Sequence, residues 1–238
     1  MCGRYASTRG RQELIDAFDV ERDAAEEFEP DFNVAPTKPA PVVLTREVRE
    51  LHIARWGLVP SWAKDTSIGG RLINARVETA HEKPAFRRAF AGRRCLLPAD
   101  GYYEWYTPAG GGKQPFFIRP GDGGVLAMAG LYEVWRPVGT DAEWLLTCTV
   151  ITTGASDDVK WIHDRMPMIV RPDRFGAWLD PALTGPEEAR SLLVPPAEGL
   201  LEAYPVSTAV NKAINNGPEL VKPLPQKGIS SETSLTLF

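Results

Sequence analysis

The second residue of the chain is a cysteine, and its position could give it unusual chemistry. If the initiator Met1 is removed, as a small second residue generally permits, Cys2 carries a free α-amine and a thiol on adjacent carbons. In model peptides the pKa of the amine is about 7.7–8.0 and that of the thiol about 8.5, so both reactive forms are appreciable near neutrality. The amine could capture an aldehyde as a Schiff base, after which sulfur closes a thiazolidine. Alternatively, the thiolate could attack an acyl carbon with the amine as its base, or Cys2 could simply be a small buried residue of a first strand.

Two further segments place polar side chains where packing does not demand them. Asn74 and Arg76 alternate with apolar residues, so they would share one face of an extended segment. Glu104 lies in an aromatic run, where burial would raise the pKa of its carboxyl group and suit it to proton transfer near neutrality. Each has a structural alternative, because Asn74 could cap a turn and Glu104 could face solvent on an edge strand.

His163 is the one histidine in a motif-like setting, beside an aspartate and Arg165. It could act as an acid or base, or it could be an ordinary loop histidine. The other two histidines have no partners at ligand spacing, and the three cysteines form no CxxC pair, so we expect neither a metal site nor a cofactor. The glycine-rich segment 110–113 lacks the pattern of a phosphate-binding loop and is predicted to be a hairpin loop.

The elements that must position these residues are mostly short strands separated by glycine- and proline-rich turns, as in an antiparallel β core. The acidic run 19–31 is expected to be a surface loop. Apolar spacing predicts helices at 7–18, 83–90, 173–179 and 187–193. Strands are predicted at 41–45, 51–56, 94–97, 101–106, 115–118, 125–131 and 144–152.

With 238 residues and 43% hydrophobic content, the chain suits a globular protein. No long linker interrupts residues 1–225, so we expect one domain followed by a flexible tail at 226–238. The net charge is −4, but arginines and lysines crowd residues 71–94, which fits either binding of one phosphate-rich segment or a solvated helix face. No apolar run approaches a membrane span, and the odd number of widely spaced cysteines favours a reducing cytoplasm.

The strongest indication comes from an ordered set of short segments between residue 2 and about residue 223. They are MCGRY, FNVAPT, WGLVPSW, INARVET, CLLPADGYYEW, QPFF, IHDRMP and PVS…VN. In this order they resemble the SRAP family, named for SOS response-associated peptidases. The resemblance implies an α+β fold: a β-rich single domain with a curved antiparallel sheet or barrel-like core and flanking short helices.

The resemblance also implies a role in DNA damage. Family members bind single-stranded DNA, favour single-strand/double-strand junctions, and crosslink to abasic sites through the N-terminal cysteine. The family's catalytic positions fall on Cys2, Asn74, Glu104 and His163. Its DNA-contacting positions fall on Arg4, Asn33, Pro36, Trp62, Arg76, Trp105 and Arg165. Where the family often has paired tryptophans, this chain has Ser61 and Trp62, which leaves one stacking contact open.

From this resemblance we expect a protein that senses abasic sites and shields them in a thiazolidine crosslink, with Glu104 and His163 moving protons. Two alternatives remain: an N-terminal-nucleophile peptidase or amidohydrolase, which could release Met1 itself, and a passive single-strand binder. We expect a monomer associated with the nucleoid. The tail ends in Leu235, Leu237 and Phe238, which resemble the short peptides that dock on the bacterial replication sliding clamp, although their usual leading glutamine is replaced by Ser234.

Overall fold

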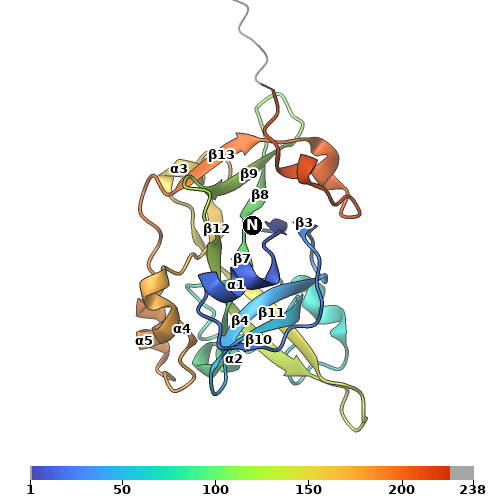
Figure 1. Ribbon diagram of the computed structural model, residues 1–238, viewed down its shortest axis with the longest axis vertical. Helices are drawn as coiled ribbons and strands as arrows, with labels where there is room; N and C mark the ends of the chain where they lie inside the picture. The colour runs from blue at the N-terminus through green and yellow to red at the C-terminus, as the bar shows by residue number, and fades with distance from the viewer. Residues whose placement is uncertain (1, 226–238) are drawn as a thin grey trace, which may run out of the picture.

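The computed structural model describes residues 2–225, and these form two β-sheets flanked by short helices (Figure 1). The strands are β1 (Tyr5–Ser7), β2 (Arg22–Asp23), β3 (Asp31–Val34), β4 (Pro39–Thr45), β5 (Arg49–Trp56), β6 (Asn74–Arg76), β7 (Arg94–Ala99), β8 (Gly101–Tyr106), β9 (Gln114–Pro120), β10 (Leu126–Trp135), β11 (Leu145–Gly154), β12 (Arg165–Pro167) and β13 (Leu201–Pro205). The α-helices are α1 (Arg11–Ala17), α2 (Arg87–Gly92), α3 (Asp157–Lys160), α4 (Phe175–Leu179) and α5 (Pro186–Ser191). The 3₁₀ helices are η1 (Thr66–Arg71), η2 (Pro172–Arg174), η3 (Thr208–Asn211) and η4 (Pro218–Val221).

Five strands of the larger sheet close into a barrel. The strand order is β12-β11-β10-β7-β4-β5-β2, and β11 also pairs in parallel with β5, which completes the ring. The short strand β6 pairs with β11 outside this ring, with Asn74 opposite Val150. This pairing holds the start of β6 against the middle of β11, which forms a long hairpin with β10.

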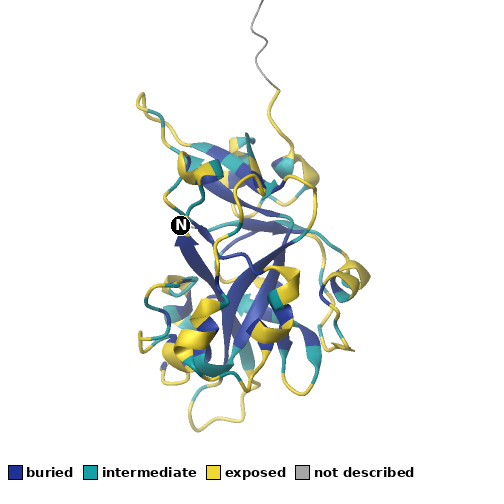
Figure 2. Cartoon of the chain, turned by 90° about the vertical axis from the view of Figure 1, so that its left-hand side faces the viewer, coloured by how far each residue is buried: buried dark blue, intermediate teal, exposed yellow. Residues whose placement is uncertain are grey.

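Side chains alternate between the two faces of the barrel wall, as the period of a strand requires. In β4, Val42 and Leu44 belong to one buried cluster, whereas Val43 belongs to a second cluster that includes Leu14 of α1 and Trp178 of α4. Because helices cover the second face, the first cluster fills the barrel interior; Figure 2 shows the buried strands behind helices with exposed outer faces. Full burial of each Val or Leu side chain stabilises the fold by about 1.5–3 kcal/mol.

The smaller sheet has the order β13-β9-β8-β1-β3 and is antiparallel throughout. Its strand β1 lies between β8 and β3, with Tyr5 opposite Tyr102 of β8. Tyr5, Tyr102 and Cys2 all pack in the cluster that fills the barrel. Cys2 is therefore held at the junction of the two sheets.

The predicted fold class is confirmed, and most predicted strands lie where the sequence placed them. The strand predicted at 101–106 is β8, and the segment around Asn74 is extended as its alternation indicated. The helix predicted at 7–18 begins only at Arg11, because Ser7 ends β1. The run 19–31 is not entirely loop, since it contains β2 and the first residue of β3.

Two predicted features lie outside the described residues: the removal of Met1, and the tail 226–238 with its clamp-like residues. Within residues 2–225, no helix is both long enough and apolar enough to cross a bilayer.

Candidate active site at the N-terminal cysteine

Cys2 lies just before β1 and is fully buried. The side-chain Nδ2 of Asn74, at the start of β6, donates a hydrogen bond of 2.7 Å to the Cys2 carbonyl oxygen. Burial raises the pKa of the Cys2 thiol, and the negative charge of nearby Glu104 raises it further. In the described conformation the thiol is therefore protonated near neutrality, and it needs a neighbouring base to become a nucleophile.

Glu104 connects the buried cysteine with an open groove. It lies in β8 two residues after Tyr102, so both side chains point to the same face of the sheet. Glu104 is 3% exposed, and burial raises the pKa of its carboxyl group while the nearby His163 opposes part of that shift. The groove has a volume of about 480 Å³ and is lined by Glu104, Trp105, Lys113, His163 and Asn211. We call it the active-site groove.

His163 lies in the loop between α3 and β12, on the wall of this groove. Its Nδ1 accepts a hydrogen bond of 2.9 Å from the backbone N–H of Arg165, which places the proton of neutral imidazole on Nε2. The same Nδ1 lies 2.9 Å from the exposed carboxylate of Asp164.

Arg4 and Asn33 form a connected unit beside the N-terminus. The Nη1 of Arg4 donates to Oδ1 of Asn33 at 2.7 Å and to the carbonyl of Val210 at 2.8 Å. Asn33 is fully buried, and its Nδ2 donates to the carbonyls of Val210, Lys212 and Asn215. In this structure, Asn33 holds Arg4 and the segment 210–215 in place and presents no exposed surface of its own.

The remaining residues predicted to contact DNA differ in solvent exposure and in whether other side chains already engage them. Arg76 is exposed at the end of β6, and Trp62 is 57% exposed in the loop before η1. Pro36 is half-buried in the turn between β3 and β4. The guanidinium of Arg165 is instead engaged by both carboxylate oxygens of Glu78, at 2.6 and 3.0 Å, and by the Thr152 carbonyl at 2.7 Å.

The sequence did not single out two residues that line the active-site groove. Lys113 is the last residue of the glycine-rich segment 110–113, which was predicted to be a hairpin loop, and the pairing of β8 with β9 brings this loop to the groove. Asn211 accepts a hydrogen bond of 2.8 Å from Nε1 of Trp105 and fixes that indole at the groove. Trp161, two residues before His163, is 52% exposed and packs edge-on against Phe116. Of these residues, only Asn211 lies in one of the segments that carry the family resemblance, PVS…VN.

The barrel holds Cys2 through the Asn74 amide and beside the buried carboxylate of Glu104, which borders a groove that His163 also lines. These features define a class of β-rich domains built around residue 2. The SOS response associated peptidase (SRAP) family matches residues 1–213, and the chain belongs to this family.

The matches extend along nearly the whole chain. It is 42% identical to the abasic site processing protein YoaM of Bacillus subtilis over 223 residues, which cover 93% of this chain and 97% of that protein. It is 34% identical to the abasic site processing protein YedK of Escherichia coli, across 94% of this chain and all of that one. A crystal structure of a Bacteroides thetaiotaomicron protein superimposes with a TM-score of 0.84 at 26% identity, covering 94% of this chain and 100% of that one.

Proposed function

We propose that this protein captures abasic sites in single-stranded DNA as a thiazolidine crosslink through Cys2, and so shields the lesion from strand cleavage. The observation that carries the proposal is the hydrogen bond from Asn74 to the Cys2 carbonyl, because it fixes residue 2 beside the buried Glu104. The relatives named abasic site processing protein support the choice of lesion. Removal of Met1 is required, since Cys2 has a free α-amine only as the first residue.

The first step is formation of a Schiff base. An abasic deoxyribose is mostly a closed hemiacetal, and opening it moves a proton between the C1′ hydroxyl and the ring oxygen. Glu104 is suited to this transfer because burial raises its pKa toward the operating pH. The α-amine of Cys2 then adds to C1′, and the resulting carbinolamine loses water to give the iminium, with Glu104 or His163 supplying the proton.

The second step closes the ring. The thiol of Cys2 gives its proton to Glu104 or His163, and the sulfur attacks C1′ of the iminium, whose electron pair returns to nitrogen. The adduct therefore weighs one water less than the protein and the DNA together. An open iminium promotes β-elimination and strand cleavage, whereas the thiazolidine has no iminium. Reversal needs protonation of the ring, which the same two side chains can supply.

The DNA is held by charge and stacking without reference to base sequence. Arg4 and Arg76 pair with phosphates flanking the lesion, and Asn33 contributes by orienting Arg4. Trp62 and Trp105 offer aromatic faces to neighbouring bases, each stacking contact being worth about 1–3 kcal/mol. Affinity is therefore expected to fall with salt and to be indifferent to the sequence around the lesion. Single-strand/double-strand junctions are suitable substrates because a strand end exposes an unstacked base.

The test is intact-mass spectrometry of the protein mixed with a single-stranded oligonucleotide carrying one abasic site. The proposal predicts a heat-stable adduct without Met1 and lighter by one water than its components. The Cys2→Ala protein and an undamaged oligonucleotide are the controls, and both should give no adduct. If protein whose Cys2 is demonstrably N-terminal forms no adduct, but hydrolyses a peptide or amide substrate, the peptidase alternative replaces this proposal.

A further inference from the structure

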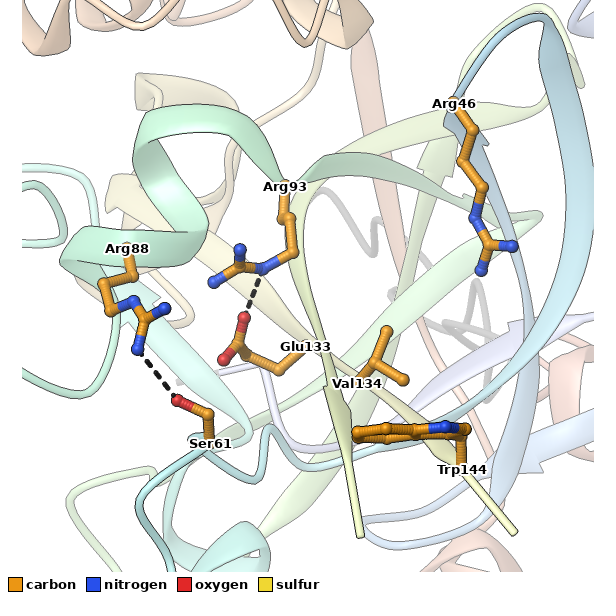
Figure 3. A pocket seen from close by; sticks show the side chains of 7 residues that line it. All are labelled: Arg46, Ser61, Arg88, Arg93, Glu133, Val134 and Trp144. Atoms are coloured by element: carbon orange, nitrogen blue, oxygen red, sulfur yellow. Dashed lines mark hydrogen bonds and ion pairs between the residues drawn. The ribbon is translucent and has the colours of Figure 1, made fainter.

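A second groove contains several arginine side chains (Figure 3) and shares no lining residue with the active-site groove. It is lined by Arg46, Ser61, Arg88, Arg93, Glu133, Val134 and Trp144, and we call it the Trp144 groove. Arg46 projects from the turn after β4, Arg88 and Arg93 lie on and just after α2, and Trp144 immediately precedes β11. None of these residues takes part in the chemistry proposed for Cys2.

The charge in this groove is poorly compensated. Glu133 is its one carboxylate, and that carboxylate is buried and paired with Arg93. Arg88 contacts only the hydroxyl of Ser61, at 3.2 Å, and no hydrogen bond or ion pair with a described residue engages the guanidinium of Arg46. Two exposed guanidinium groups are thus available to bind anions from opposite walls (Figure 3).

The groove also has an exposed aromatic surface. Trp144 is 59% exposed, and the guanidinium of Arg136 lies 4.2 Å from the centroid of its indole ring. Arg136 is itself exposed, so a flat group can stack either on the open part of the indole or on the outer face of this guanidinium. An exposed indole near the guanidinium groups of Arg46 and Arg88 suits a ligand that combines planar rings with negative charges.

The position of the groove connects it to the predicted DNA path. Ser61, which accepts the hydrogen bond from Arg88, directly precedes the exposed Trp62. Val150, which pairs with Asn74, follows Trp144 along the chain. At about 3.3 Å per residue, the strand between Trp144 and Val150 is about 20 Å long. At about 3.4 Å per stacked nucleotide, this corresponds to roughly six nucleotides. The Trp144 groove therefore lies within a few nucleotides' length of Asn74, the residue that holds Cys2.

We propose that the Trp144 groove is a second binding site for single-stranded DNA, with Arg46 and Arg88 holding phosphates and Trp144 with Arg136 stacking a base. The site requires no lesion and no reaction at Cys2, so it binds intact DNA. It extends the contact of a single strand beyond the active-site groove and raises the affinity for long strands.

The test measures equilibrium binding of a labelled, undamaged single strand of about 20 nucleotides, longer than the site sizes typical of such grooves. Fluorescence anisotropy is followed at several salt concentrations, in full-length protein carrying Cys2→Ala so that no crosslink forms. Trp144→Ala should weaken binding about tenfold. The double change Arg46→Ala with Arg88→Ala should reduce the slope of log affinity against log salt by about 1.4, at about 0.7 per phosphate contact. Arg171→Ala, an exposed arginine paired with Asp173 elsewhere, is the matched control and should change neither quantity.

A second readout separates this site from the chemistry. In protein that retains Cys2, the groove variants should form the crosslink with abasic DNA at the unchanged rate once DNA is saturating. Unchanged affinity in the anisotropy assay would overturn the proposal, and so would an equal loss of affinity for blunt duplex, or arginine effects without any effect of Trp144→Ala. A wild-type protein that forms no crosslink at all would refute the proposed function but leave the anisotropy result valid, because that assay uses intact DNA.

Discussion

Both grooves of this protein contain a buried glutamate, a tryptophan and basic side chains. The group proposed to act is buried in one groove and exposed to solvent in the other. In the active-site groove, Glu104 is buried, the pKa of its carboxyl group is raised, and Cys2 is anchored by Asn74. In the Trp144 groove Arg46 and Arg88 project into solvent, and the buried carboxylate of Glu133 is paired with the half-buried Arg93. A buried, oriented group can perform a proton transfer at one defined atom, whereas an exposed charge on a long side chain adapts to any phosphate.

This difference predicts how each region responds to change. Removing a positioned group from the active-site groove should greatly slow a chemical step with little effect on DNA affinity. Removing a charge from an adaptable surface should lower affinity gradually and in a salt-dependent way. The following predictions test that division, beginning with the largest effect.

Glu104→Gln should slow formation of the crosslink by about 10²–10⁴-fold, because the amide keeps the shape of the carboxyl group but cannot transfer a proton. Affinity for intact single-stranded DNA should stay within about twofold, since the substituted side chain is buried and away from the phosphates. Single-turnover crosslinking at saturating DNA measures the rate, and anisotropy measures the affinity. Glu133→Gln, a buried carboxylate of the other groove, is the matched control; an equal loss of rate in both variants would remove the distinction between the grooves.

Asn33→Ala should weaken DNA binding about tenfold, although the Asn33 side chain is fully buried. The substitution removes the acceptor that orients Arg4 and the donor to three carbonyls, leaving buried groups unsatisfied at a cost of about 1–3 kcal/mol in the free energy of unfolding. Urea unfolding and anisotropy measure the two effects. Arg4→Ala should lower affinity without the full loss of stability, and if it does not, Asn33 acts through the segment 210–215 instead of through Arg4.

Glu78→Gln should strengthen DNA binding by up to about fivefold. Both carboxylate oxygens of Glu78 occupy the guanidinium of Arg165, and a partly exposed pair of this kind contributes about 0–1 kcal/mol. A neutral amide competes less well with a phosphate for the same guanidinium. Anisotropy at low salt measures the gain, which should disappear in the double variant with Arg165→Ala. Weaker binding in Glu78→Gln alone would mean that Glu78 positions Arg165 for DNA.

The smallest expected effect is a pH dependence of stability. Burial raises the pKa of Glu104 in the folded protein above its value in the unfolded chain. The unfolded carboxyl, with a pKa near 4.3, therefore loses its proton first, and the stability contributed by protonated Glu104 is lost as pH rises from there through the raised value. The Tm of the wild-type protein should fall relative to that of Glu104→Gln as the pH rises above the unfolded value of about 4.3. A constant difference in Tm over this range would contradict the raised pKa.

The features that could be predicted from the sequence are those that depend on a local residue pattern or on the ordered segments of the family resemblance. Alternation around Ala75 predicted that Asn74 and Arg76 lie on an extended segment, and β6 confirms it. The family resemblance assigned residues 2, 74, 104 and 163 to one site, although they are far apart in the chain. The local features could be predicted because neighbouring residues along a strand determine them.

Pairings between residues that are distant in the sequence could not be predicted from local patterns. The parallel contact of β11 with β5 closes the barrel, yet no local pattern distinguishes it from an open sheet. Lys113 reaches the active-site groove only because β8 and β9 pair, and Glu78 engages Arg165 although the two residues are distant in the sequence. The burial of Asn33 likewise depends on a segment that follows much later in the chain. Each requires the tertiary structure.

The central claim is that both functional groups of Cys2 bind the same carbon of the lesion, and chemical trapping tests it most directly. Wild-type, Cys2→Ser and Cys2→Ala proteins, each with Met1 removed, are mixed with abasic single-stranded DNA with and without borohydride, which reduces a Schiff base to a stable amine. We predict a heat-stable adduct without borohydride for the wild type alone, and adducts of the two variants only when borohydride is present. A heat-stable adduct of Cys2→Ala without borohydride, or a wild-type adduct that requires borohydride, would contradict the thiazolidine.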